Sequence, residues 1–138
     1  MSAPETTHAP PQDMPHILLV DDALTIRAYL ERLLTDAGYR VSAAINGAEG
    51  LERALLDRPD MVLADLNMPQ MNGLEMVKQL RANSSAVQMP VAMLTTEQDD
   101  HDIADAIAVG ANFHMSKPPQ PETVLEIVHL LSGRGDLS

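Results

Sequence analysis

Five short apolar runs alternate along this chain with five segments of helical pattern, and each run ends at a polar residue. The first run, Ile17–Val20, is four residues long and stops at Asp21. Runs this short and this uniformly apolar are typical of strands buried on both faces. Strands that alternate with helices predict a doubly wound α/β fold, in which right-handed crossovers join parallel strands and helices cover both faces of the sheet.

The expected elements follow one another closely along the chain. The strands are expected at Ile17–Val20, Arg40–Ile45, Asp60–Leu66, Pro90–Leu94 and Asn112–Ser116. The helices are expected at Ala23 to the C-cap glycine Gly38, Ala48–Asp57, Gly73–Arg81, Asp102–Val109 and from Pro121 onward. These bounds predict one folded domain over residues 15–132, a disordered tail rich in Pro and Thr over residues 1–14, and a short tail over 133–138.

The composition limits the classes of function. The absence of cysteine excludes disulfides, thiolate metal sites and a Cys nucleophile, and fits a reducing compartment. The formal net charge of −11 disfavours binding to nucleic acid or anionic lipid, and it also has the simpler explanation of solubility. Neither a secretory signal nor a membrane span is recognisable, so a cytoplasmic location is expected.

Side chains suited to chemistry stand at the ends of four of the five expected strands. Asp21 and Asp22 stand at the end of the first, Asp65 at the end of the third, Thr95 at the end of the fourth and Lys117 at the end of the fifth. Singly, each has an ordinary explanation: the aspartates as caps, the threonine in a turn, the lysine on a solvated surface. Because the carboxyl ends of parallel strands share one edge of the sheet, where ligands bind in such folds, the joint pattern predicts a functional site.

The predicted site combines three carboxylates with one hydroxyl and one ammonium group. Clustered carboxylates repel one another, and a divalent cation relieves that conflict. Oxygen ligands without His or Cys indicate Mg²⁺, with Mn²⁺ as the alternative. Asp65 is then the expected nucleophile that forms an aspartyl-phosphate, while the metal, Lys117 and Thr95 bind the phosphoryl oxygens.

Four motifs carry a family resemblance: ILLVDDALTIR, MVLADLNMPQMNG, PVAMLTTE and MSKP. With them the sequence, from Pro15 to Leu131, resembles the receiver domains of two-component response regulators. The resemblance implies a flavodoxin-like (βα)5 fold with strand order 2-1-3-4-5. It also implies that Asp65 accepts a phosphoryl group, that Asp22 binds Mg²⁺ directly, and that Asp21 acts through water.

Further roles follow from the same resemblance. The backbone carbonyl of Asn67 is expected to complete the metal ligands, Thr95 to shift on activation, and the Lys117–Pro118 bond to be cis. The modulating positions are Asn67, Thr96 and Glu97, and the pair Asn67 and Glu97 resembles that of chemotaxis-type receivers, in which hydrolysis is comparatively quick.

The sequence departs from the family at the switch position. His114 stands three residues before the lysine, where Tyr or Phe is common. One hypothesis is that His114 moves with Thr95 and makes the output surface sensitive to pH. The other is that it is an exposed imidazole on an edge strand.

The leading hypothesis is a stand-alone response regulator, because only residues 133–138 follow the last expected helix. A histidine kinase or phosphotransfer protein would supply the phosphoryl group, and a downstream protein would read the face built by the fourth helix, fifth strand and fifth helix. The chain would be a monomer or a phosphorylation-dependent dimer, and would catalyse only its own phosphorylation and dephosphorylation. Chemotaxis is one plausible pathway.

Several alternatives stay open. The chain is alternatively a receiver excised from a larger regulator, a phosphorelay intermediate or phosphate sink, or a degenerate receiver used for binding alone. A Mg²⁺-dependent aspartyl-phosphate phosphatase is disfavoured, because Asn67 stands where such enzymes carry a second acid. A nucleotide-binding domain is weaker still, because no glycine-rich phosphate motif follows the first strand.

Overall fold

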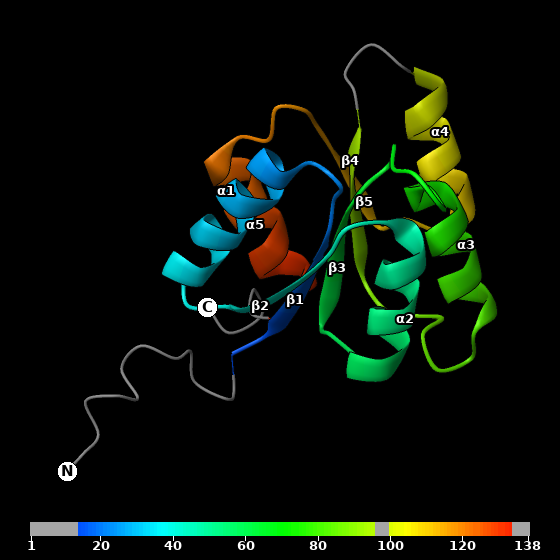
Figure 1. Cartoon of the computed structure of the whole chain (residues 1–138), viewed down its shortest axis with the longest axis horizontal. Coiled ribbons are helices and arrows are strands. Elements are labelled where there is room, and N and C mark those ends of the chain that lie inside the picture. The colour runs from blue at the N-terminus through cyan, green and yellow to red at the C-terminus, as the bar shows by residue number, and fades with distance from the viewer. Residues whose placement is uncertain (1–13, 96–99, 134–138) are drawn as a thin grey trace.

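Five parallel strands form one sheet in the order β2-β1-β3-β4-β5. The computed structural model describes residues 14–95 and 100–133 (Figure 1). The strands are β1 (His16–Val20), β2 (Arg40–Ala44), β3 (Met61–Asp65), β4 (Val91–Thr95) and β5 (Phe113–Ser116). The predicted doubly wound fold and its strand order are therefore confirmed.

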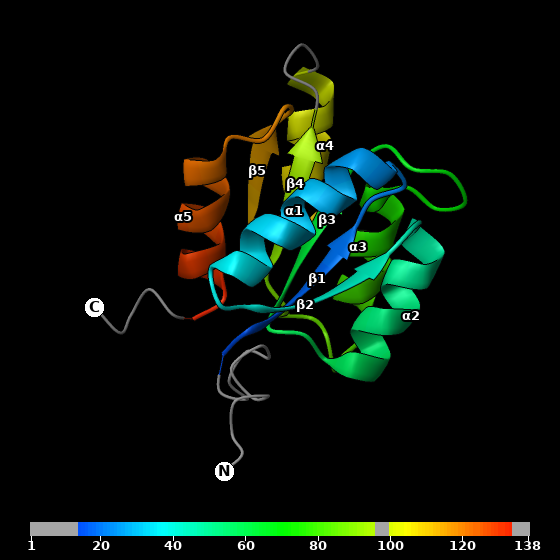
Figure 2. The same cartoon turned by 60° about the vertical axis from the view of Figure 1, so that its left-hand side comes forward.

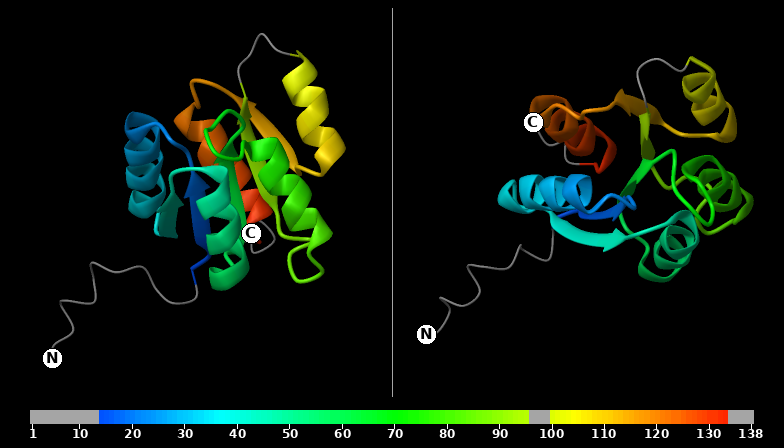
Figure 3. Two further views of the ribbon diagram at one scale, coloured as in Figure 1. Left: turned by 45° about the vertical axis from the view of Figure 1, so that its right-hand side comes forward. Right: turned by 45° about the horizontal axis from the view of Figure 1, so that its top comes forward.

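Five helices cover the two faces of the sheet. They are α1 (Leu24–Asp36), α2 (Gly47–Asp57), α3 (Gly73–Ala82), α4 (Asp100–Val109) and α5 (Pro121–Leu131). Helices α1 and α5 lie on one face, and α2, α3 and α4 on the other (Figures 2 and 3). This division gives the protein two separate apolar layers with the sheet between them.

Alternate strand residues enter the two layers, which explains why the three central strands, β1, β3 and β4, are almost entirely apolar. In β1, Ile17 and Leu19 pack toward α1 and α5, whereas Leu18 and Val20 pack toward α2 and α3. All four are buried. A strand that supplies both cores has no polar face, so its apolar run ends only where the sheet does.

The second and third predicted strands have three bounds that are each wrong by one residue. The second strand ends at Ala44 rather than Ile45, because the Ile45 N–H turns away to the Glu49 carboxylate at 2.8 Å. The Asn46 side chain accepts from the Glu49 N–H at 2.8 Å, which completes a reciprocal cap at the start of α2. The third strand is Met61–Asp65 rather than Asp60–Leu66, and the Asp60 carboxylate instead accepts from the His16 N–H at 2.7 Å.

Other predicted bounds differ where sequence signals are weak. The first strand begins at His16 rather than Ile17, and the fifth at Phe113 rather than Asn112. The fourth strand begins after Pro90, which has no N–H for a ladder, and includes Thr95. Helix α1 begins at Leu24 and ends at Asp36, α2 begins at Gly47, α3 continues to Ala82, and α4 begins at Asp100.

The chain ends are described only in part. Met14 is the one residue of the predicted N-terminal tail within the described part, and its carbonyl accepts from Arg40 Nε at 3.0 Å. Thr96 and Glu97, two of the predicted modulating positions, lie outside the described residues. Within residues 14–95 and 100–133, no helix is long and apolar enough to cross a membrane.

His16 links the start of β1 to the edge strand β2. Its Nε2 lies 2.7 Å from Ser42 Oγ. Burial lowers the pKa of this imidazole and the Arg40 charge lowers it further, against the opposing effect of Asp57 and Asp60. The neutral ring is therefore the form that the fold favours.

We expect stability to fall in acid partly through His16. Above the ordinary histidine pKa, His16 is neutral in both the folded and the unfolded protein, and it takes nothing from the unfolding free energy. As the pH falls from there toward the lowered pKa of the folded state, the unfolded protein binds the proton more readily, and the unfolding free energy decreases. Between about pH 8 and about pH 5, the His16→Gln variant should therefore lose less unfolding free energy than the wild type. Urea unfolding followed by circular dichroism at both pH values measures this, and equal losses would contradict the assignment.

Candidate functional site

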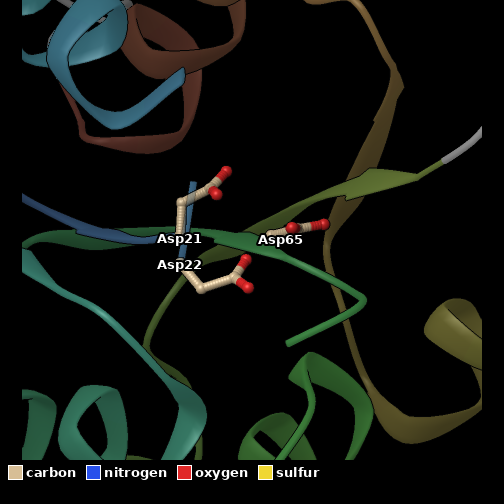
Figure 4. A group of neighbouring side chains, drawn as sticks. All are labelled: Asp21, Asp22 and Asp65. Atoms are coloured by element: carbon tan, nitrogen blue, oxygen red, sulfur yellow. The ribbon is translucent and has the colours of Figure 1, made fainter. Parts of the chain in front are cut away.

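Three carboxylates meet where β1 and β3 end. Asp21 and Asp22 directly follow β1, and Asp65 is the last residue of β3. The register pairs Val20 with Ala64, so the next residues, Asp21 and Asp65, lie at the same level of the sheet edge. One oxygen of each carboxylate lies within 4.8 Å of the others (Figure 4). Asp21 and Asp65 are buried, whereas Asp22 is exposed.

Lys117 supplies the positive charge beside Asp65. Its Nζ lies 2.8 Å from Asp65 Oδ1, and the Asp65 side chain is 3% exposed. The same oxygen accepts the Asn67 N–H at 3.2 Å. The Lys117 N–H donates to Thr95 O at 2.8 Å, which places the lysine at the end of the sheet. The Lys117–Pro118 bond is cis, as the resemblance implies.

The negative charge of the Asp21 carboxylate is less well compensated than that of Asp65. Asp21 Oδ1 accepts the Ala23 N–H at 2.8 Å, but its buried Oδ2 has no hydrogen-bond partner among the described residues. Burial raises the pKa of Asp21, and the neighbouring Asp65 and Asp22 raise it further, against the Ala23 hydrogen bond and Lys117. A cation at this cluster would meet an unpaired carboxylate oxygen and offset the repulsion.

The donor set therefore fits a hard divalent ion. Carboxylate oxygens from Asp21, Asp22 and Asp65 converge, and no sulfur or imidazole ligand joins them within the described residues. Such oxygen sets suit Mg²⁺, which binds few protein groups and keeps positions for water and phosphate.

We expect Asp21→Asn to stabilise the metal-free protein. A raised folded pKa means that the carboxylate penalises folding above that pKa, and that the penalty disappears as the pH falls below the ordinary Asp value. Asparagine keeps the acceptor for the Ala23 N–H and removes the buried charge. Urea unfolding in chelator at neutral pH should show a gain of about 1 kcal/mol. A loss of stability would contradict the account.

Thr95 ends β4 beside the aspartate. The register pairs Asp65 with Leu94, so Thr95 lies one residue further along the same edge. Its side chain is buried, and Oγ1 donates to the Met115 carbonyl at a long 3.5 Å. A weakly held hydroxyl at this position is free to exchange its partner for a new acceptor.

His114 lies on the edge strand β5, as one of the two hypotheses states, but the imidazole is half-buried rather than exposed. Its ring stacks on Phe113 with centroids 6.0 Å apart. Its buried Nδ1 has no hydrogen-bond partner among the described residues. The ring also lines a hollow of about 310 Å³ with Met115, Pro118 and Gln120.

Arg27 is a positioning group that the sequence analysis did not single out. Its guanidinium donates to the Asp21 carbonyl at 2.8 Å from one turn into α1. This contact fixes the backbone between the first two acids. The sequence offers only a weak signal, since an arginine at this place in a helix is ordinary.

Residues 17–129 match the family described as the response regulator receiver domain. The chain belongs to this family. Among curated relatives, the receiver is 34% identical over 122 residues to the chemotaxis protein CheY1 of Helicobacter pylori, covering 87% of this chain and 98% of CheY1. It is 32% identical over 123 residues to the transcriptional regulatory protein AfsQ1 of Streptomyces coelicolor, covering 89% of this chain.

Solved structures of receivers share the fold. The chemotaxis response regulator CheY4 of Vibrio cholerae superposes with a TM-score of 0.80 at 40% identity, covering 86% of this chain and 98% of that one. The receiver domain of the sensor histidine kinase PA1611 of Pseudomonas aeruginosa superposes with a TM-score of 0.81 at 26% identity, covering 87% and 98%. That structure holds a magnesium ion in its active-site cleft.

The relatives differ in length. This chain spans nearly all of CheY1, but only 53% of AfsQ1. The receiver is thus the shared unit, found both as almost the whole of a protein and as part of a longer one.

Proposed function

We propose that this receiver is a stand-alone response regulator that accepts a phosphoryl group on Asp65 with the help of Mg²⁺. The observation that carries the proposal is the setting of the Asp65 carboxylate. It is buried, with an ammonium group 2.8 Å away and two further carboxylates within 4.8 Å. Such a site both positions an aspartate as nucleophile and offers charges of each sign around the incoming group.

Mg²⁺ would be held by the carboxylates of Asp22 and Asp65 and the carbonyl of Asn67, with Asp21 acting through water. When bound, it would neutralise charge on the phosphoryl oxygens. An Asp65 oxygen attacks phosphorus as the bond to the donor, a phosphohistidine nitrogen, breaks. The leaving imidazole takes up a proton. Lys117 and Thr95 then donate to the new phosphoryl oxygens, since both already lie at this edge.

The output face is proposed to be α4, β5 and α5, read by a downstream protein or by a second copy after phosphorylation. Three large apolar side chains are exposed on these elements: Ile107, Phe113 and Leu130. Movement of Thr95 would be transmitted to the output face through Met115, because the Thr95 hydroxyl donates to the Met115 carbonyl. His114 lies between Phe113 and Met115 and is the proposed second switch residue.

The wider role follows from the same site. A histidine kinase or phosphotransfer protein in the cytoplasm would supply the phosphoryl group, and the protein would catalyse only its own phosphorylation and dephosphorylation. The likeness to CheY1 favours chemotaxis control. The half-length match to AfsQ1 supports the second candidate, a receiver belonging to a longer regulator.

The proposal is tested with acetyl phosphate as a small phosphodonor. Intact-protein mass spectrometry should show the gain of one phosphoryl group in MgCl₂, no gain in chelator, and no gain in Asp65→Asn. Modification that is unchanged in Asp65→Asn or in chelator would refute it. A control at an exposed acid of α1, Glu31→Gln, should behave as the wild type.

We expect the aspartyl-phosphate to be short-lived. Asn67 is exposed two residues after the acceptor, where a small side chain leaves water a path to the phosphorus. The Asn67→Arg variant should hydrolyse its phosphoryl group about tenfold more slowly, which corresponds to a barrier about 1.4 kcal/mol higher. The decay of the phosphorylated mass after removal of acetyl phosphate measures this. Equal rates would count against the assignment of Asn67 as a modulating residue.

A further inference from the structure

The loop between β3 and α3 holds an unusual backbone. Gln70 has φ of 57° and Met71 has φ of 110°, and neither is glycine. L-residues rarely adopt positive φ, and they keep it only where the surroundings enforce it. This loop begins directly after Asp65 and carries Asn67. A contact that holds Gln70 and Met71 therefore acts on the same loop that carries Asn67.

Gly47, the first residue of α2, provides the enforcing contact. Its N–H donates to the Met71 carbonyl at 3.0 Å. A Cβ on Gly47 would lie 2.0 Å from that oxygen and 2.7 Å from the carbonyl carbon. Both are backbone atoms, so no side-chain rotation relieves the overlap. The close approach requires that this residue have no side chain.

Two further contacts hold the loop, one at its strained corner and one at its base. The Asn46 amide lies 3.4 Å from Gln70 Oε1, beside the Gly47 contact. At the base, the Gly73 N–H donates to the Leu66 carbonyl at 2.9 Å. The loop is thus closed at its base and held at its strained corner by the start of α2.

We propose that Gly47 is a positioning residue for the Mg²⁺ site. By holding Met71, the turn from β2 to α2 fixes the loop that presents the Asn67 carbonyl to the metal. This inference rests on the function proposed above, because it concerns the affinity of the same site. Gly47 is not among the residues proposed to hold the metal or the phosphoryl group, and its contact is with the Met71 backbone, so its effect would be exerted through the loop.

The test compares two glycine substitutions in α2. A Cβ on Gly50 would also be crowded, at 2.8 Å from Val20 Cγ1 and 2.9 Å from Met76 Sδ, and its three nearest atoms all belong to these two residues rather than to the loop. Gly47→Ala and Gly50→Ala should therefore both lower the urea midpoint. In NMR titrations with MgCl₂, Gly47→Ala should bind at least about tenfold more weakly than the wild type, and Gly50→Ala within about twofold of it.

The outcomes separate this inference from the proposed function. If Gly47→Ala folds and binds Mg²⁺ with the affinity of the wild type, or with the same affinity as Gly50→Ala, the inference is overturned and the proposed function is not affected. A wild type that binds no Mg²⁺ overturns the proposed function and the inference with it.

A second variant decides the case if Gly47→Ala does not fold. Met71→Gly keeps the carbonyl that accepts from the Gly47 N–H. It makes the backbone at residue 71 more flexible, because glycine adopts either sign of φ with similar ease. Its Mg²⁺ affinity should fall about threefold or more with a urea midpoint near that of the wild type. An unchanged affinity would overturn the inference.

Discussion

Replacing Lys117 with methionine is expected to slow the phosphorylation of Asp65 about 10²- to 10³-fold, the typical loss when one donor to developing charge is removed. The Lys117 ammonium lies 2.8 Å from the Asp65 carboxylate. Methionine has a similar length but neither the charge nor the hydrogen-bond donors. The rate constant for mass gain with acetyl phosphate in excess MgCl₂ measures the effect.

The chain offers a matched control for this prediction. Lys78 is the other lysine in the sequence and is exposed on α3. Lys78→Met removes the same charge and should phosphorylate at the wild-type rate. If both variants are slowed equally, net charge rather than the Asp65 contact governs the reaction. If Lys117→Met reacts at the wild-type rate, the lysine has no part in it.

Substituting Gly73 by alanine should destabilise the protein by about 3 kcal/mol or more. A Cβ at this position would lie 2.5 Å from the Asp65 carbonyl oxygen and 3.0 Å from the Leu66 Cα. These atoms belong to the backbone at the end of β3, so relief of the overlap would shift the acceptor itself. Urea unfolding in chelator gives the change in unfolding free energy.

Gly133 gives the comparison. It has φ of 94°, but a Cβ there would meet nothing within 4 Å. Gly133→Ala should therefore cost about 1 kcal/mol through backbone strain alone. A Gly73→Ala variant no less stable than Gly133→Ala would show that the start of α3 is not packed against the acceptor as described.

The sheet was predictable because its physical signal is local. A strand such as β1 contributes side chains to both apolar layers, so its sequence is an unbroken apolar run that ends at the edge of the sheet. The same rule places Asp21 and Asp65 at one edge. The strand order is not a local property, and came from the resemblance of the motifs. The end of the second strand was predicted at Ile45, but its position depends on the Glu49 side chain, which accepts from the Ile45 N–H at the start of α2. A pattern of apolar residues does not indicate such a cap.

The loop contacts were not predictable in the same way. Gly47 and Met71 are 24 positions apart in the sequence, and nothing in either residue type announces their contact. Met71 is an unusual residue for a positive φ, so turn propensities do not indicate it. The partial burial of His114 was equally hidden, because edge strands are often exposed. Its ring stacks on Phe113, and the residue lines a hollow with Pro118 and Gln120.

The site is arranged at the expense of stability. Asp21 keeps a buried, unpaired oxygen and a raised pKa beside two other acids. An amide side chain would suit the metal-free fold better, because it keeps the acceptor for the Ala23 N–H without a buried charge. The retained charge is explained if the acids serve a cation, which is why Asp21→Asn should gain stability as it loses metal affinity.

The most direct test is a crystal structure with Mg²⁺ and beryllofluoride, a stable mimic of the phosphoryl group. We expect one ion bound by Asp22, Asp65 and the Asn67 carbonyl, and the beryllium group on an Asp65 oxygen. Thr95 Oγ1 and Lys117 Nζ should both lie within hydrogen-bond distance of its fluorides. A beryllium group on another residue, or an ion that avoids Asp65, would contradict the account.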